Sequence, residues 1–199
     1  ENHISNIGAM DVNAVVDVYT RGHSDSSGAS TYTTYATAET HAEAIAQGIR
    51  VGSGDDEIIN TGSLSVTSTA KATAYTRSDE VATSKAVSKA VGIGIDGGSG
   101  RNTIINEGDL NVITRTYAFA GYDMDEVDDP TISVVTMTSA IGITGGDGGS
   151  TIRNSGAIDV TAYDYGSWLF TNARNVNAVG IRGGSGDDTI VNEGKIDTF

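Results

Sequence analysis

One pattern, Ile-x-Asn-x-Gly followed by apolar residues at alternate places, recurs five times along the 199 residues. Its central asparagines are Asn6, Asn60, Asn106, Asn154 and Asn192. The copies follow one another at intervals of 38 to 54 residues, so the motif is constant while the joining segment varies in length. Self-similarity at such a period predicts an array of stacked structural units, each of which contacts mainly its neighbours.

A glycine-rich block precedes four of the five copies. The blocks lie at residues 48–56, 94–100, 142–148 and 180–188. Glycine at this density predicts a tight turn in which the backbone adopts positive φ or approaches a neighbouring segment closely.

Small side chains occupy every second position between these blocks, as in Ala70, Ala72 and Ala74 and again in Ala82 and Ala86. A period of two residues is typical of β-strands. Because the repeated face is small, we expect two strands of each unit to lie close together over a thin, tightly packed layer. Charged or turn-forming stretches at 21–27, 77–80 and 122–130 would form the tips between them.

These observations predict an all-β fold, a parallel β-solenoid (β-helix) of about five rungs with long strand arms and glycine-rich turns. The chain would form a single domain, with rungs at approximately 1–54, 55–100, 101–149, 150–186 and 187–199. Rungs in register stack about 4.8 Å apart. The five asparagines would then form a ladder of side-chain amides along the axis. The alternative is that they serve only local turns.

The charge balance restricts the partners. Twenty-six acidic residues against 12 basic ones give a net charge of −14, which repels nucleic acid and anionic lipid. We therefore expect no nucleic-acid partner. No run of 18 apolar residues is present, so no membrane insertion is expected. The absence of cysteine excludes disulfides and thiolate metal sites. We expect a secreted protein of the cell surface.

Residues 183–191, Gly-Gly-Ser-Gly-Asp-Asp-Thr-Ile-Val, resemble the calcium-binding nonapeptide of the repeats-in-toxin family, and residues 52–59 resemble it with one glycine fewer. In that family, turn carbonyls and an aspartate bind Ca²⁺ between coils, so the resemblance implies Asp56 and Asp188 as carboxylate ligands. Asn102 and Ser150 stand at the same place in the middle rungs. The full set of candidate metal ligands is Asp55, Asp56, Asp187, Asp188, Asn102 and Asp147. Alternatively, these side chains satisfy backbone amides of the turns.

Other chemistry has little support in the sequence. No Gly-x-Ser-x-Gly, His-Glu-x-x-His or P-loop motif is present, and the three histidines share no repeat position, so we expect no enzymatic activity. The acidic tip around 123–129 lacks the spacing of an EF-hand loop and is expected to be a solvated loop. Tyr163, Tyr165 and Trp168 are candidate contacts for cell-surface or matrix glycans, or they fill space left by the short fourth arm.

The sequence enters the repeat at Ile4 and ends within it at Phe199, with no readable cap. Because solenoid ends expose aliphatic side chains and unpaired backbone groups, we expect them to stack on a matching surface. The leading hypothesis is a homopolymer, an extracellular filament or matrix formed head-to-tail by continuing the β-ladder. The alternative rests on a resemblance to the solenoid repeats of bacterial secreted adhesins and autotransporter passengers, which implies a stalk fragment of a large surface adhesin with sites for calcium or carbohydrate.

Overall fold

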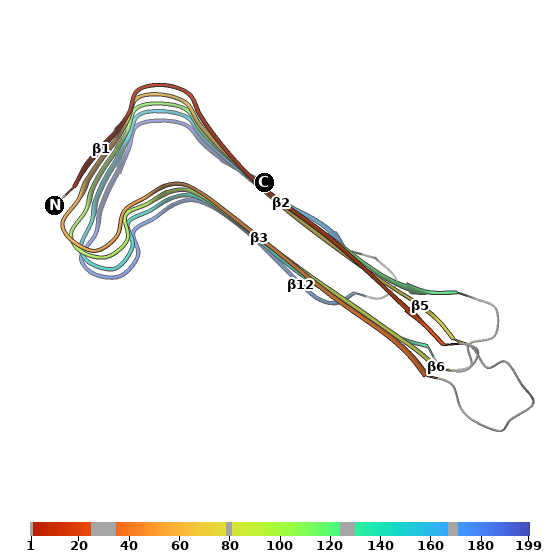
Figure 1. Ribbon diagram of the computed structural model, residues 1–199. Helices are drawn as coiled ribbons and strands as arrows, with labels where there is room; N and C mark the ends of the chain where they lie inside the picture. Colours follow the sequence, from red (N-terminus) through yellow and green to blue (C-terminus); the bar gives the residue numbers. More distant parts are fainter. Residues whose placement is uncertain (1, 25–34, 79–80, 124–129, 167–170) are drawn as a thin grey trace, which may run out of the picture.

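The computed structural model describes residues 2–24, 35–78, 81–123, 130–166 and 171–199. These residues form strands and turns without a helix, and the strands make three parallel sheets stacked around one axis. The predicted all-β parallel solenoid is confirmed. Figure 1 looks along the stack, so that successive coils lie over one another as a short arm and a long, two-layered arm.

Sheet A is the short arm and contains the Ile-x-Asn motif of each coil. Its strands, in spatial order, are β1 (His3–Asn6), β4 (Glu57–Asn60), β7 (Thr103–Asn106), β10 (Thr151–Asn154) and β13 (Thr189–Asn192). Pairing is in register throughout, so Ile4 lies opposite Ile58 and Asn6 opposite Asn60. Because side chains alternate between the two faces of a strand, every isoleucine and asparagine of the motif points inward.

Sheets B and C form the two layers of the long arm. Sheet B holds the outgoing strands β2 (Met10–His23), β5 (Leu64–Arg77), β8 (Leu110–Tyr122), β11 (Ile158–Gly166) and β14 (Ile196–Thr198). Sheet C holds the return strands β3 (Tyr35–Arg50), β6 (Val81–Asp96), β9 (Thr131–Thr144) and β12 (Thr171–Arg182). Each coil therefore runs through sheets A, B and C before the glycine turn.

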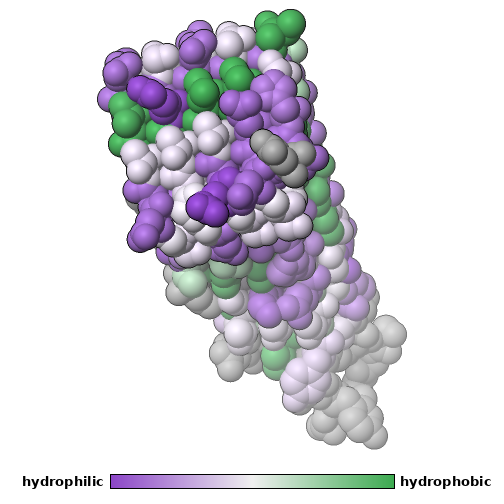
Figure 2. Space-filling view, turned by 90° about the vertical axis from the view of Figure 1, so that its left-hand side faces the viewer, coloured by the Kyte–Doolittle hydropathy of each residue, from purple (hydrophilic) through white to green (hydrophobic). Residues whose placement is uncertain are grey.

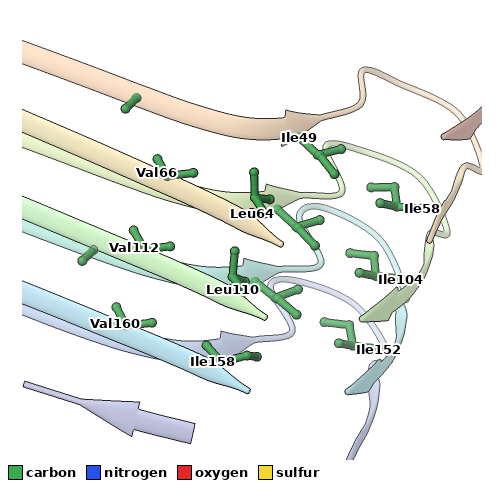
Figure 3. Close-up of a cluster of buried hydrophobic side chains, with 14 of the residues drawn as sticks. Ile49, Ile58, Leu64, Val66, Ile104, Leu110, Val112, Ile152, Ile158 and Val160 are labelled. Atoms are coloured by element: carbon green, nitrogen blue, oxygen red, sulfur yellow. The ribbon is translucent and has the colours of Figure 1, made fainter. Parts of the chain in front are cut away.

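The wide end of each coil contains an aliphatic core. Ile58, Leu64 and Val66 are at most 1% exposed, and the same three positions recur one coil later as Ile104, Leu110 and Val112. Figure 3 shows these side chains repeating in columns from coil to coil, with Ile49 beside them. Burial of an aliphatic side chain of this size contributes roughly 1.5–3 kcal/mol. The motif's alternating apolar positions are therefore the main source of stability at this end.

The long arm has a thinner interior made of small side chains. Ala70, Ala72 and Ala74 of β5 are fully buried against the alanines of sheet C. Buried hydroxyls join the two layers, since Ser68 Oγ donates to the Ala44 carbonyl oxygen at 2.9 Å and Ser88 Oγ donates to that of Ala70, also at 2.9 Å. Small residues at alternate places therefore let the sheets approach closely.

Glycine is required in the turns between sheets C and A. Gly54, Gly100, Gly148 and Gly186 occupy one repeat position, with φ between +102° and +127°. A Cβ atom on Gly100 would also lie 2.1 Å from the Gly54 carbonyl oxygen of the previous coil. The turns thus combine a left-handed backbone with the close approach that stacking imposes.

The fourth coil is shorter, and its interior contains a carboxylate that pairs with a more exposed arginine. The side chain of Asp164 in β11 is only 2% exposed, and its carboxylate accepts hydrogen bonds from Arg174 Nε at 2.5 Å, Thr136 Oγ1 at 2.8 Å and the Gly166 amide at 2.9 Å. Arg174 belongs to the return strand β12, so the pair ties sheets B and C together. The carboxylate occupies the inward position that Thr116 holds in the third coil and Ala70 in the second.

Candidate functional site

The five asparagines of the repeat form a hydrogen-bonded ladder. Each Nδ2 donates to the Oδ1 of the next coil, at 2.7 Å from Asn6, 2.6 Å from Asn60, 2.6 Å from Asn106 and 2.7 Å from Asn154. In the last three coils Nδ2 also donates to a glycine carbonyl oxygen two residues further on, as from Asn106 to Gly108 at 3.0 Å. The asparagines therefore serve the axial ladder and, in these coils, the local turn as well.

The ladder has a direction, and its two ends differ. Within the part of the chain that the structure describes, Asn6 Oδ1 accepts no hydrogen bond. At the other end, Asn192 Nδ2 donates to the Gly194 carbonyl oxygen at 2.9 Å, and no described residue accepts a bond from its second N–H. One end face thus presents an acceptor and the other a donor.

Both end faces also expose the solenoid interior. Ile190 is 45% exposed, whereas Ile58, Ile104 and Ile152 at the same repeat position are completely buried. Strands β2 and β3 have no further strand on their outer side among the described residues. Unpaired edges with exposed apolar side chains are surfaces on which another β-structure readily pairs.

The candidate calcium ligands divide into buried and exposed positions. Asp56 is 3% exposed, and its Oδ1 accepts hydrogen bonds from the backbone N of Asn2 at 2.7 Å and from Asn2 Nδ2 at 2.8 Å. Asn102 Oδ1 likewise accepts from the Asp56 amide at 3.1 Å, and Asp188 Oδ1 from the Ser150 amide at 2.8 Å. This repeat position therefore satisfies backbone amides of the preceding coil.

The second carboxylate oxygen of Asp56 is different. Oδ2 is buried and has no hydrogen-bond partner among the described residues. At the same position one coil later, Asn102 Nδ2 donates to the carbonyl oxygens of Gly100 at 3.2 Å and Gly145 at 3.4 Å. An amide group at Asn102 thus satisfies turn carbonyls that a carboxylate oxygen cannot satisfy without a cation.

The remaining candidate ligands do not join Asp56. Asp55 is exposed and accepts a hydrogen bond from the Arg101 amide at 2.8 Å, while exposed Asp147 accepts one from Ser185 Oγ at 3.2 Å. Asp187 is also exposed. Across the described ranges, no group of three or more His, Asp or Glu side chains that could hold a metal is found. Most of the acidic tip, residues 124–129, lies outside the described residues.

Aromatic side chains gather on the outer face of sheet B. Tyr163 and Tyr165 are 42% and 49% exposed and lie at outward positions of β11. Tyr165 stacks on Tyr117 of the previous coil, with ring centroids 4.6 Å apart and planes within 6°, and Arg115 lies 5.7 Å from the Tyr163 ring centroid. Trp168, the third candidate glycan contact, lies outside the described residues.

This face also contains Arg115, Tyr117 and Phe119, which were not among the predicted site residues. The signal was available, because Arg115 and Tyr117 precede Tyr163 and Tyr165 by the same interval that separates Gly108 from Gly156. The outward-facing residues of successive coils therefore repeat at the same interval as the inward-facing ones. This interval places Arg115 in one column with Tyr163 and Tyr117 in one column with Tyr165.

Ion pairs on the outer faces link the first two coils. Lys71 Nζ lies 3.1 Å from Asp17 Oδ2, Lys85 Nζ 2.6 Å from Glu39 Oε1, and Lys89 Nζ 2.7 Å from Glu43 Oε1. The hydrogen bond from each lysine, with its positive charge, lowers the pKa of Glu39 and of Glu43. Since all these groups are exposed, the pairs favour the register between coils more than they add stability.

The face formed by sheet A and the glycine turns is mainly polar. Figure 2 shows it with scattered hydrophobic patches among hydrophilic side chains. A hollow of about 320 Å³ on it is lined by Ile105, Arg153, Val191 and Glu193, among others, and no candidate ligand or catalytic residue converges there.

Comparison of the chain with protein-family models, with curated proteins and with solved structures gives no match. Within the described ranges, no helix has the length and apolar character needed to cross a membrane.

Proposed function

We propose that this chain is a non-enzymatic structural protein of the cell exterior that assembles head-to-tail, each copy continuing the β-ladders of the one before. The observation that carries the proposal is the polarity of the asparagine ladder. Asn192 of one copy has a free amide donor, and Asn6 of the next has a free acceptor. Hydrogen bonds in such chains polarise one another. A joint whose amide hydrogen bond runs in the same direction as the ladder would therefore extend a cooperative array of hydrogen bonds.

The exposed interior supports the same arrangement. Ile4 of an incoming copy would cover Ile190, which is 45% exposed, and the free edge of β13 in sheet A would gain a backbone partner in the incoming β1. A joint between opposite faces of identical subunits is heterologous, and it generates an open filament unless the rotation closes a ring. The net charge of −14 would keep such a filament soluble and laterally separate.

Sedimentation velocity over a wide range of protein concentration tests this proposal. The chain should form oligomers whose size grows with concentration. Asn6→Lys replaces the free acceptor with a charge on the end face and should leave monomers. Ser5→Lys is the matched control, because Ser5 is the adjacent residue but is exposed on the outer face of sheet A. Monomers of the unchanged chain at every concentration would refute the proposal.

The second candidate is a stalk segment of a large surface adhesin, in which further coils of one polypeptide cover the same end faces. The observation in its favour is the pairing of β14. This strand pairs with only three residues of β11, at Ile158, Asp159 and Val160. A second copy joined through sheet A would leave the rest of β11 without a partner on the edge that faces β14. A longer strand in place of β14 would cover this edge. Monomers in the sedimentation experiment are the result that this arrangement predicts.

We also propose that calcium binds at the Asp56 turn. The supporting observation is the buried, unpartnered Asp56 Oδ2, at the position where Asn102 uses its amide on two turn carbonyls. Ca²⁺ prefers carboxylate and carbonyl oxygens and would neutralise this carboxylate. Without calcium, the buried oxygen destabilises the fold.

A thermal-unfolding experiment distinguishes the calcium-bound protein from the calcium-free protein. Calcium should raise the Tm of the unchanged chain. Asp56→Asn supplies the amide that Asn102 already has, so this variant should have a higher Tm without calcium and no response to it. Asp187→Asn, at an exposed carboxylate of an equivalent turn, should retain the calcium response of the unchanged chain. If calcium changes the Tm of neither the unchanged chain nor Asp187→Asn, the result contradicts a site at Asp56.

A further inference from the structure

The outer face of sheet B carries a regular array of aromatic and cationic side chains, called here the aromatic platform. It contains Lys71 of β5, Arg115, Tyr117 and Phe119 of β8, and Tyr163 and Tyr165 of β11. Register pairing places Lys71, Tyr117 and Tyr165 in one axial column and Arg115 and Tyr163 in the next. The platform therefore spans three coils, and only stacking of the solenoid assembles it.

Phe119 has an unusual position within the platform. A Cβ atom on Gly121 would lie 2.8 Å from Cε1 and 3.0 Å from Cζ of Phe119, so the ring extends over the glycine on the same strand. One side of the ring is thus supported by the sheet, while the side chain remains 49% exposed. The ring thus covers a strand glycine, and an apolar surface of the ring faces outward.

A groove runs between the column of Lys71, Tyr117 and Tyr165 and the neighbouring pair of Thr73 and Phe119. It has a volume of about 390 Å³, its floor is formed by Ala72 and Ala118, and Lys71, Tyr117, Tyr165 and Phe119 are among its walls. This volume is within the range of small-molecule sites, which are mostly apolar with a few polar groups. Exposed apolar side chains that gather in one place on a soluble protein mark an interaction surface.

The chemistry of the groove restricts its ligand. Aromatic faces are electronegative and attract C–H groups, while tyrosine hydroxyls form hydrogen bonds. The cations are already engaged, Lys71 with Asp17 at 3.1 Å and Arg115 with the Tyr163 ring at 5.7 Å. The net charge of −14 repels polyanions at longer range. A ligand with apolar C–H faces, many hydroxyls and no charge satisfies all these conditions.

We propose that the aromatic platform binds a neutral oligosaccharide. This inference goes beyond the structural role proposed above and does not depend on head-to-tail assembly, because the platform lies on a lateral face and the joint on the end faces. It predicts a solenoid that displays a glycan-binding surface along its side.

An array of neutral and uronic-acid-containing oligosaccharides, probed with the full 199-residue chain, tests the proposal. Binding should be restricted to neutral members. Phe119→Ala should weaken it about tenfold, which corresponds to the loss of one ring's contact. Tyr165→Phe should retain most of the stacking contribution, and Tyr165→Ala should lose it. Tyr35→Ala is the matched control, since Tyr35 is 69% exposed on sheet C.

Circular dichroism and sedimentation identify other causes of a lost signal. The platform variants should keep the β-signal and the assembly behaviour of the unchanged chain, because they change only the lateral face. Absence of binding to every array member would overturn the proposal. So would preferential binding of the acidic members, or a lateral dimer that Tyr165→Ala dissociates in the absence of sugar.

Discussion

Asn106 lies at the centre of the asparagine ladder, where loss of one side chain should cost the most. It is completely buried and takes part in three hydrogen bonds: from Asn60 at 2.6 Å, to Asn154 at 2.6 Å and to the Gly108 carbonyl oxygen at 3.0 Å. Asn106→Ala leaves all three partners unsatisfied in the interior. At roughly 1–1.5 kcal/mol for each bond, the free energy of unfolding should fall by about 4 kcal/mol.

The matched variant is Asn192→Ala at the end of the same ladder. Asn192 accepts one bond from Asn154 at 2.7 Å and donates one to the Gly194 carbonyl oxygen at 2.9 Å, and this last bond is exposed to solvent. Because water can replace the lost partners, we expect a cost of about 1 kcal/mol. Asn106→Leu preserves volume but not hydrogen bonding, and it should resemble Asn106→Ala.

Urea unfolding followed by circular dichroism measures the difference. With a slope of about 3 kcal/mol per molar urea, the midpoint should fall by about 1–2 M for Asn106→Ala and by a few tenths for Asn192→Ala. Equal losses at the two positions, or a loss at Asn106 below about 1 kcal/mol, would show that the amides are not the axial connection described here.

Three further predictions concern other parts of the coil. Gly100→Ala should destabilise the chain by about 3 kcal/mol in urea unfolding, because φ is +110° and Cβ meets a carbonyl oxygen, whereas Gly52→Ala, with open space around it, should change little. Asp164→Ala should cost about 3 kcal/mol because Thr136 Oγ1 and the Gly166 amide lose their acceptor, while Asp159→Ala, exposed on the same strand, should cost less than about 0.5; similar midpoints would contradict this. The lowered pKa of Glu43 means that its ion pair stabilises the fold above the ordinary glutamate pKa of 4.5, and that this contribution disappears as pH falls through the lowered value. An NMR titration should show the pKa of Glu43 rising in Lys89→Ala, and an unchanged value would exclude the lysine as the cause.

Much of the fold followed from the sequence because stacking imposes a constraint on every coil. Ile58, Asn60 and Gly62 recur at fixed spacing since each must pair with its own equivalent, and the alternation of Ala70, Ala72 and Ala74 reports the inward face of a strand. Variable loop lengths do not disturb either signal. The repeat therefore predicted the parallel sheets directly.

The candidate sites were less predictable, because they depend on contacts between coils that no single segment records. Asp56 and Asn102 occupy one repeat position, but only the structure shows that the amide of Asn102 satisfies two turn carbonyls while an oxygen of Asp56 has no partner. Similarly, Tyr163 and Tyr165 were found as a local aromatic cluster. Their partners Tyr117 and Arg115 come from the previous coil.

The proposed head-to-tail joint is tested most directly by cryo-electron microscopy of the concentrated protein, with calcium and with chelator. We expect filaments with an axial repeat of about 24 Å, corresponding to five strands of sheet A. Density should be continuous across each joint, with Asn192 of one copy facing Asn6 of the next. Dispersed single particles under both conditions, or filaments joined through lateral faces, would contradict it.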